Sequence, residues 1–336
     1  MSTATSSSST PPALVFSPYK DTSIGMDWNT NAIQSAVGGV AAPIGADLVA
    51  SGGRTVTLAF ATGECGDESW GGVAGATLAK ANVSALVASG ARYIVSTGGA
   101  NGPFTCGSDA GFAAFVSRWQ SAGLVGVDFD IEAGQTPAVI RDLVLRIQTA
   151  HGSFPTLRFS VTLATLANND GGAAAKSLGP GVADSLNAYG DEALQAIGQT
   201  FGPGWPSYLT VNLMVMDYGT ASSGVCVVRG AACDMGQSAL QAVYNLHDQH
   251  AVPYENIEVT PMIGQNDAAG EQTTLADVDT IASFALAEKL GGAHFWSYDR
   301  DVDCAAGAAS ATCNSMGAGY AGPHGYLKRF LEDGLH

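Results

Sequence analysis

Positive charge is scarce in this chain of 336 residues. Lysine and arginine together number 14, against 30 aspartates and glutamates, and the formal net charge is −16. A protein with so few cations has little with which to bind the phosphates of nucleic acids or of anionic lipid surfaces. The composition therefore argues against a nucleic-acid partner and favours a partner that is neutral or positively charged.

Long hydrophobic runs are also absent. No apolar stretch approaches the ~18 residues that a membrane-spanning helix needs, so no membrane partner is expected. Hydrophobic residues nevertheless make up 46% of the chain and charged residues only 13%. That apolar share can close a sizeable core, and the length allows one large domain or two ordinary ones.

The six cysteines include no C-x-x-C pair, which argues against a zinc ribbon or a thioredoxin-type site. Cys226 lies near Cys233, and Cys304 near Cys313, in segments rich in Gly, Ala and Asp that are typical of loops. The other two, at positions 65 and 106, both follow apolar runs and can meet at one end of a sheet. Six cysteines allow 15 pairings. We expect three disulfides and a secreted, extracellular protein; the alternative is six free thiols in a cytosolic protein.

Residues 1–12 read MSTATSSSSTPP. Segments rich in Ser, Thr and Pro behave as linkers or tails, and this one lacks the basic stretch and apolar core of a secretory signal. Either a natural precursor carries a signal or a further module upstream, or the N-terminus is naturally disordered. Residues 13–336 show no second break in composition and are expected to form one domain.

Within that domain, eight β-rich runs alternate with Ala-rich stretches. Most of the runs are almost continuously apolar, which is typical of parallel strands buried on both faces. The predicted strands are Leu14–Ser17, Thr55–Ala61, Tyr93–Ser96, Val125–Ile131, Leu157–Leu163, Leu209–Met216, Ile257–Ile263 and Ala293–Ser297. The predicted helices are Asn31–Ala50, Thr77–Ser89, Asp109–Ser121, Pro137–Ala150, Asp191–Gln199, Gln237–His250, Leu275–Leu290 and His324–Leu331.

Eight strands, each followed by a helix, predict an α/β fold of the (β/α)8 TIM barrel type with disulfides in its loops. The alternative, a doubly wound open sheet, would favour a glycine-rich phosphate loop after the first strand, where this chain has Tyr19-Lys-Asp-Thr instead. In a barrel the carboxyl ends of the strands converge on one face. The residues at those ends are mostly carboxylates, amides and aromatics, which suit a carbohydrate: Tyr19, Glu64, Ser96, Asp128, Asp130, Glu132, Thr162, Met214, Met216, Asp217, Tyr218, Gln265, Asn266 and Trp296.

The strongest signal is the run Gly126-Val-Asp-Phe-Asp-Ile-Glu132. Side chains alternate along a strand, so Asp128, Asp130 and Glu132 share one face and the apolar residues between them share the other. We expect the apolar face to pack against helices and the acids to point into the barrel. Three buried carboxyls cannot all ionise cheaply, so at least one should keep a proton near neutral pH, as a general acid must. The alternatives are a solvent-facing strand and a Mg²⁺ or Ca²⁺ site completed by Asp217 or Glu64.

This acid run resembles the D-x-x-D-x-D-x-E signature of the family 18 glycoside hydrolases, the retaining chitinases, except that Val125 stands at the first Asp. The family's S-x-G-G motif is matched by Ser96-Thr-Gly-Gly99. Its Met-x-Tyr-Asp motif is altered to Met214-Val-Met-Asp-Tyr218, with the Tyr after the Asp. Trp296 ends the eighth strand, and the segment from Tyr19 to Asn31 is similar to a bacterial chitinase subgroup.

The resemblance implies hydrolysis of chitin and other β-1,4-linked N-acetylglucosamine chains by substrate-assisted retention, without a cofactor or metal. Glu132 would be the general acid and base, Asp130 would orient the N-acetyl group, and Asp128 would share a proton with Asp130. The residues expected to bind the sugar are Asp217, Tyr218, Met214, Trp296, Gln265, Asn266 and Tyr19.

Two alternatives to the hydrolase remain at this stage. One is a barrel that binds chitin or N-acetylglucosamine with little catalysis, and the other is a metal-dependent enzyme that uses the same carboxylates. The chain is expected to act as a monomer on a glycan. The seventh and eighth strands are joined by little more than one helix, which favours a shallow cleft and cleavage within chains.

Overall fold

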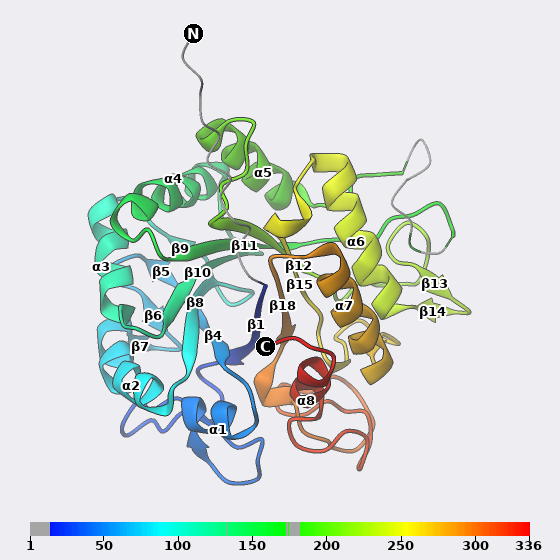
Figure 1. The fold of residues 1–336 in the computed structure, drawn as a ribbon, viewed down its shortest axis with the longest axis horizontal. Helices are drawn as coiled ribbons and strands as arrows, with labels where there is room; N and C mark the ends of the chain where they lie inside the picture. The colour runs from blue at the N-terminus through cyan, green and yellow to red at the C-terminus, as the bar shows by residue number, and fades with distance from the viewer. Residues whose placement is uncertain (1–13, 133, 173, 175–181) are drawn as a thin grey trace.

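The apolar runs of the sequence form a closed barrel of eight parallel strands (Figure 1). The computed structural model describes residues 14–132, 134–172, 174 and 182–336, so the predicted linker at residues 1–12 lies outside the described residues. The barrel strands are β1 (Val15–Asp21), β4 (Thr55–Ala61), β8 (Arg92–Gly98), β10 (Leu124–Ile131), β11 (Arg158–Ala164), β12 (Leu209–Met214), β15 (Ile257–Thr260) and β18 (Gly292–Trp296). The predicted (β/α)8 barrel is confirmed.

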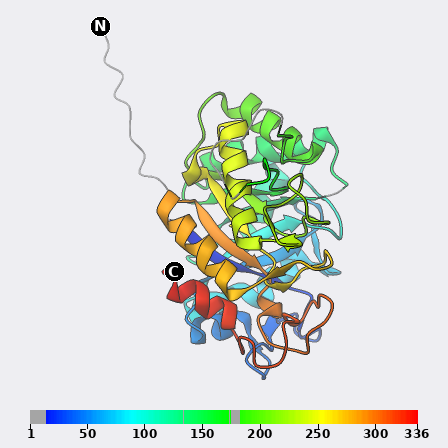
Figure 2. The same ribbon diagram turned by 90° about the vertical axis from the view of Figure 1, so that its right-hand side faces the viewer.

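Helices surround the barrel in chain order (Figure 1), and α7 and α8 lie side by side on the face seen in Figure 2. They are α1 (Ile44–Ala50), α2 (Gly75–Ser89), α3 (Asp109–Trp119), α4 (Pro137–Ser153), α5 (Ala188–Phe201), α6 (Met235–His250), α7 (Leu275–Glu288) and α8 (Gly325–Glu332). Side-chain caps fix several starts, since Ser108, Asn187 and Asp234 each accept a backbone N–H from the first turn. Thr274 and Asp277 form a capping box at α7.

One predicted helix is wrong over most of its length. The segment from Asn31 to Ala50 becomes helical only at Ile44, and the residues before α1 include the paired strands β2 (Gln34–Ser35) and β3 (Ala42–Pro43). Gly39 adopts a left-handed φ of 89° between these strands, and Pro43 has no N–H for a helix interior. The chain therefore turns back on itself before the helix begins.

Three disulfides are present, as predicted: Cys65–Cys106, Cys226–Cys233 and Cys304–Cys313. The first joins the segments that follow β4 and β8, next to the parallel pair β5 (Gly63–Glu64) and β9 (Phe104–Thr105). The second closes the hairpin of β13 (Val228–Arg229) and β14 (Ala232–Cys233), and the third clips the segment after β18. Two further hairpins are β6 (Ser69–Trp70) with β7 (Val73–Ala74), and β16 (Gly264–Gln265) with β17 (Gln272–Thr273).

The two faces of the barrel wall differ sharply. Val127, Phe129 and Ile131 face outward and are buried, and the Phe129 ring lies 5.7 Å from that of Phe112 on α3. The inward face is polar: the register places Asp128 between Ser96 on β8 and Ser160 on β11. The expected division between apolar and acidic faces of β10 is confirmed, and it aims the acids along the barrel axis.

None of the helices in the described ranges combines the length and hydropathy that crossing a membrane would require.

Candidate active site

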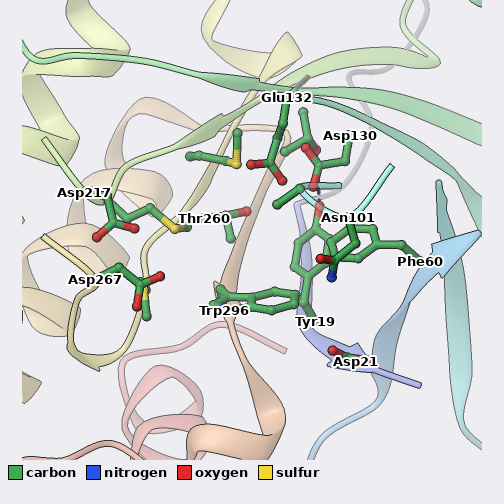
Figure 3. A pocket seen from close by; sticks show the side chains of 15 residues that line it. Tyr19, Asp21, Phe60, Asn101, Asp130, Glu132, Asp217, Thr260, Asp267 and Trp296 are labelled. Carbon is green, nitrogen blue, oxygen red and sulfur yellow. Dashed lines mark hydrogen bonds between the residues drawn. The ribbon is translucent and has the colours of Figure 1, made fainter. Parts of the chain in front are cut away.

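A cavity of about 220 Å³ opens where the barrel strands end (Figure 3). Its lining joins strand ends with the loops that follow them, as expected for the functional face of this fold. The lining residues are Tyr19, Asp21, Phe60, Ala100, Asn101, Asp130, Glu132, Thr162, Met214, Met216, Asp217, Thr260, Met262, Asp267 and Trp296. The structure thus brings six of the ten predicted site residues to one cavity, and a seventh, Asp128, directly beneath it.

Asp128 lies inside the barrel, 1% exposed, and acts as a hydrogen-bond hub. Its Oδ1 accepts from Ser160 Oγ at 2.6 Å and Thr162 Oγ1 at 2.7 Å. Its Oδ2 accepts from Ser96 Oγ at 2.6 Å and from the Tyr19 hydroxyl at 3.0 Å. Four donors occupy about all the lone pairs of one carboxylate, so the Asp128 side chain is fixed in one orientation.

Asp130 and Glu132 lie above it, within hydrogen-bonding reach of each other, and both project into the cavity (Figure 3). Burial, reinforced by the charges of Glu132 and Asp128, raises the pKa of Asp130 well above its usual range. Burial also raises the pKa of Glu132, against the hydrogen bond with Asp130 that lowers it. The pair therefore retains a proton to higher pH than isolated carboxyls would, as the sequence predicted for one of the three acids.

The Asp130 carboxyl has one unsatisfied atom. Asp130 is 3% exposed, and its Oδ1 has no hydrogen-bond partner among the described residues. A buried acceptor without a donor is unfavourable, and Asp130 is one of the residues that line the cavity. The site is therefore prepared for a hydrogen-bond donor on a ligand.

Tyr19 connects the first strand to this group. Its hydroxyl donates to Asp128, lies 3.2 Å from Thr162 Oγ1 and accepts from Asn212 Nδ2 at 2.9 Å. Burial, followed by the charges of Asp128 and Asp130, raises the pKa of Tyr19 well above its usual range. The phenol is thus a fixed neutral donor that holds Asp128 in place, while the ring forms part of the cavity wall.

A second polar group fills the barrel below. Arg158 forms an ion pair with Glu258, whose Oε2 also lies 3.0 Å from His294 Nε2. The Nδ1 atom of His294 lies 2.9 Å from Ser17 Oγ. Burial, aided by the nearby positive charge of Arg158, lowers the pKa of His294 to about 3, so the imidazole is neutral at ordinary pH. Beneath the acids the barrel therefore carries one buried ion pair and a neutral histidine.

Aromatic rings form the wall opposite the acids. Trp296 stacks on Phe60, with ring centroids 5.6 Å apart and planes 20° from parallel. Its indole faces the side from which Glu132 and Asp130 project (Figure 3). An indole face of this kind suits the C–H side of a sugar ring, which was the predicted role of Trp296. Phe60 was not predicted, because nothing in the apolar run of β4 distinguishes it.

The side chains of Asp217 and Tyr218, just after the end of β12, point to different places. Asp217 adopts a left-handed φ of 53°, and its Oδ1 accepts from the Ala268 amide at 2.8 Å. That turn leaves the Asp217 carboxyl on the cavity and carries Tyr218 into the core, 3% exposed, away from the lining. Tyr218 is thus not among the residues that line the cavity, and its contact with the sugar stays a prediction. Met216 lines the cavity at the place where the family motif has its Tyr.

Gln265 and Asn266 lie outside the cavity lining, and both amides bond within or beside the hairpin of β16 and β17. Gln265 Nε2 donates to the Glu271 carbonyl at 3.0 Å, and its Oε1 accepts from Gln272. Asn266 Nδ2 donates to the Met262 carbonyl at 2.9 Å. Both are buried and absent from the lining, so they support the loop that carries Asp267 rather than the ligand.

The cavity continues past Glu132 into a second trough of about 390 Å³. Glu132, Met214, Met216 and Asp217 border both spaces. The other residues of the second trough are uncharged: Ala164, Thr165, Leu166, Ser185, Leu186 and Asn187. A chain-like ligand can therefore pass Glu132 with units on either side.

The donor set does not favour a metal at the acids. Glu64 lies outside the cavity, and its oxygens bind Thr105 Oγ1 and the Gly107 amide. In the described ranges, the two groups of three or more His, Cys, Asp or Glu with ligand atoms within 4.8 Å of one another both lie away from β10. One contains the Cys65–Cys106 disulfide, and the other is Asp184, Asp191 and His250.

The two glycines of the Ser-Thr-Gly-Gly segment allow close packing at the site because they have no side chains. Gly98 has a φ of 89°, and a Cβ there would lie 2.0 Å from the carbonyl oxygen of Asp130. A Cβ on Gly99, whose φ is 81°, would lie 2.9 Å from the Phe60 ring. The backbone of β8 can approach the acid strand closely only because these positions lack side chains.

Comparisons with known proteins point to one group. No protein-family model matches the chain. Among solved structures, the catalytic domain of a hyperthermophilic chitinase from Pyrococcus furiosus superposes with a TM-score of 0.65 at 22% identity, over 96% of both chains. A GH18 chitinase from Flavobacterium johnsoniae superposes with a TM-score of 0.51 at 13% identity, over 97% of this chain and 98% of that one. The fold is that of the family 18 chitinases.

Curated relatives agree over a shorter stretch. A probable bifunctional chitinase/lysozyme of Escherichia coli is 34% identical over 101 residues, and endochitinase 11 of Metarhizium anisopliae is 33% identical over 104. These stretches are 27% and 28% of this chain but only 11% and 20% of the relatives' lengths. The resemblance to family 18 chitinases drawn from the acid run and the Ser-Thr-Gly-Gly segment is confirmed.

Proposed function

We propose that this protein is a retaining chitinase that hydrolyses β-1,4-linked N-acetylglucosamine chains with the help of the substrate's own N-acetyl group. The observation that carries the proposal is the pair of buried carboxyls, Asp130 and Glu132, which lie within hydrogen-bonding reach of each other and face Trp296 across a cavity at the barrel mouth. The chitinase fold of the neighbouring structures supports it.

In the proposed reaction Glu132 donates its proton to the glycosidic oxygen as the bond to the anomeric carbon breaks. The N-acetyl carbonyl oxygen attacks that carbon and forms an oxazolinium ion, so the nucleophile comes from the substrate. Glu132, now a carboxylate, takes a proton from water as the water opens the ring with overall retention. Acid and base roles thus alternate on one residue.

Asp130 has the position to assist this cycle. Its unsatisfied Oδ1 meets the N–H of the acetamido group, which aims the carbonyl at the anomeric carbon. When substrate binds, its proton passes to Glu132, which then donates it to the glycosidic oxygen, and the Asp130 carboxylate left behind faces the positive charge of the oxazolinium. Asp128 acts from below. Its hydroxyl donors hold it in place, and its proximity is one of the causes that raise the pKa of Asp130, which helps Asp130 retain a proton until substrate binds.

The two troughs on either side of Glu132 suit cleavage within a chain. The sugar that supplies the N-acetyl group would stack on Trp296, and the leaving chain would lie in the neutral trough. The three disulfides favour an oxidising compartment, so we include secretion in the proposal, with a glycan as partner and a monomer as the working form.

Hydrolysis of a chromogenic chitobioside tests the proposal. Glu132→Gln should lower kcat by about 10² to 10⁴-fold, because a general acid contributes a factor of that order. Asp142→Asn, a change at an exposed position on α4, is the matched control and should keep the rate. NMR of early products from a chitin oligomer should show the β-anomer. Full activity in Glu132→Gln, an initial α-anomer, or activity that EDTA abolishes and Mg²⁺ restores would each contradict the mechanism.

A further inference from the structure

Glu271 is a buried carboxyl outside the cavity, and the proposed chemistry does not use it. It lies directly before β17, is 2% exposed and is absent from the cavity lining. An ionisable side chain is costly to bury unless its oxygens are hydrogen-bonded. The partners of this carboxyl therefore indicate what it does.

Both oxygens of Glu271 accept from the turn that follows β12. Its Oε2 accepts from the Tyr218 amide at 3.0 Å, and its Oε1 accepts from the Gly219 amide at 2.7 Å. The amide before these, that of Asp217, lies 3.4 Å from Asn266 Oδ1. Successive backbone N–H groups of this kind form a concavity that suits an anion. Here the segment between β16 and β17 supplies that anion from within the chain.

The turn is one that needs to be held. Asp217 has a left-handed φ of 53°, and Gly219 has a φ of 94°. The left-handed region is unfavourable for a residue that carries a side chain. The two hydrogen bonds to Glu271 offset this cost, so the conformation of Asp217 depends on the Glu271 carboxyl.

The two segments hold each other reciprocally. The Asp217 carboxyl accepts from the Ala268 amide at 2.8 Å and also from the Asp267 amide. Each segment thus places one carboxyl on backbone amides of the other, and we call these contacts the Asp217–Glu271 latch. Asp217 and Asp267 lie on the same side of the cavity (Figure 3). The latch therefore fixes a wall of the cavity from outside it.

Charged groups from several elements face this latch. Burial raises the pKa of Asp217, as does the charge of Asp267, whereas the charge of Arg300 after β18 lowers it. Burial raises the pKa of Glu271, and the amides of Tyr218 and Gly219 lower it, which favours the carboxylate.

The latch connects to the proposed acid through Asp217. Glu132 and Asp217 border both the cavity and the second trough. Burial raises the pKa of Glu132, and the charge of Asp217 raises it further. Glu271 is not among the causes that shift this pKa, so its influence on Glu132 passes through the position of Asp217.

We propose that Glu271 is a positioning residue for the reaction: its carboxylate fixes the turn at residues 217–219 and so holds the Asp217 carboxyl on the wall that it shares with Glu132. This inference rests on the proposed function, because the acid that it serves is Glu132. Without the latch, Asp217 returns to an unstrained backbone conformation and its carboxyl leaves the wall.

Glu271→Gln tests the proposal, because the amide keeps one acceptor oxygen but turns an NH2 group toward the other backbone N–H. The measurement is kcat against pH on the chitobioside. The alkaline limb, where Glu132 loses its proton, should move to lower pH by about 0.3 to 0.7 unit, as for the loss of one partly exposed charge. The position of the limb does not depend on how much of the protein is active, so a simple loss of stability would not move it.

Further variants show whether the effect passes through Asp217. In Asp217→Asn, where the charge is already gone, adding Glu271→Gln should give no further shift. Gln272→Ala removes the hydrogen bond to Gln265 in the same hairpin without touching the turn, and should leave the limb in place. An unmoved limb in Glu271→Gln, an equal shift in the Asp217→Asn background, or an equal shift in Gln272→Ala would each overturn the proposal.

Glu271→Asp guards against failure of the first variant to fold. It keeps the charge but withdraws the carboxyl by one CH2 group, so the limb should move in the same direction by a smaller amount. If Glu271→Gln does not fold, an unmoved limb in Glu271→Asp overturns the proposal.

A 13C NMR titration of the Glu132 carboxyl, assigned by its loss in Glu132→Gln, reports the same pKa without turnover. An unchanged pKa in Glu271→Gln, in a chain that hydrolyses the chitobioside, would overturn the positioning role alone. Failure of the unmodified chain to hydrolyse the chitobioside would overturn the proposed function, and the titration would still decide whether the latch acts on Glu132.

Discussion

At the residue scale, Asp217 shows how one backbone angle decides which side chains reach the ligand. Its left-handed φ of 53° turns the chain so that the carboxyl meets the cavity and Tyr218 enters the core. A non-glycine residue in this conformation is uncommon. The altered Met-x-Met-Asp-Tyr run suggests that both residues serve the site, but the order of residues does not reveal the turn. This is why the sequence does not show that Asp217 lines the cavity whereas Tyr218 enters the core.

Asp217→Asn should move the alkaline limb of the rate–pH profile to lower pH. The proposed mechanism needs a proton on Glu132, and the negative charge of Asp217 is one of the causes that raise the pKa of Glu132. Removing that charge lowers this pKa, so the acid form, and with it kcat, is lost at a lower pH. The measurement is kcat against pH on the chitobioside.

Asp267→Asn is the matched comparison for that profile. Asp267 acts on the pKa of Asp217 and is not among the causes that shift the pKa of Glu132. The alkaline limb of the Asp267→Asn profile should therefore move less than that of Asp217→Asn. If the alkaline limb of Asp217→Asn stays in place or moves to higher pH, the charge of Asp217 does not raise the pKa of Glu132.

The acids themselves were predictable because a strand has period two. Asp128, Asp130 and Glu132 alternate with buried apolar residues, and that pattern alone puts them on one face. Asn101 and Asp267, by contrast, reach the cavity from loops. No local pattern marks a loop side chain for a cavity, since its position depends on where the barrel closes.

At the scale of elements, strands were easier to place than the segments between them. Parallel strands buried on both faces are continuous apolar runs, so the predicted Thr55–Ala61 coincides with β4. Segments between elements follow turn chemistry instead. The expected helix at Asn31–Ala50 failed at Gly39 and Pro43, where a left-handed φ and a missing N–H favour a hairpin. Weighting those two residues more heavily would have shortened the helix.

The three disulfides should differ in their contribution to stability. Cys65–Cys106 spans 41 residues, whereas the other two span 7 and 9. Loop-closure entropy then gives a loss of about 4 kcal/mol for the pair Cys65→Ala/Cys106→Ala and about 2.5 kcal/mol for either short bridge. Urea unfolding of the three double-alanine variants measures this. Equal losses for all three, or the smallest loss for Cys65/Cys106, would contradict the ranking.

At the scale of the whole molecule, the barrel interior is unusual in being polar along much of its length. The hub at Asp128 lies above the Arg158–Glu258 ion pair and His294, all within the wall of parallel strands. Inward-facing positions of such barrels are commonly filled by branched apolar residues. Here the apolar residues face the helices and the axis holds hydrogen bonds, so stability should depend on pH.

His294→Gln should remove a contribution to stability that shrinks as the pH drops. The pKa of His294 is about 3 in the folded protein and near 6.5 when unfolded, so the unfolded chain binds the extra proton between these values. The contribution of His294 to the free energy of unfolding therefore falls as pH drops from 6.5 toward 3, by up to about 1.4 kcal/mol per pH unit. Urea unfolding of both proteins between pH 7 and pH 4 measures the difference in slope.

Asp299 and Asp301, two buried acids, change stability with pH in the opposite direction to His294. Both are present in the unmodified protein and in His294→Gln. Burial raises the pKa values of Asp299 and Asp301 to about 6, so their contribution is present at low pH and is lost as pH rises through that value. Subtracting the two curves leaves the histidine alone. Parallel curves would mean that His294 is not buried in its neutral form.

Strand β8 ends at Gly98, where the structure has no space for a side chain. This limits which positions around the cavity can accept a substitution. Since a Cβ at Gly98 would lie 2.0 Å from the carbonyl oxygen of Asp130, any replacement must displace strand β10. Phe60, by contrast, stacks on Trp296 and lines the cavity. Substitutions that alter which ligand the cavity accepts are therefore expected at rim positions such as Phe60. Gly98, which packs against strand β10, should tolerate none.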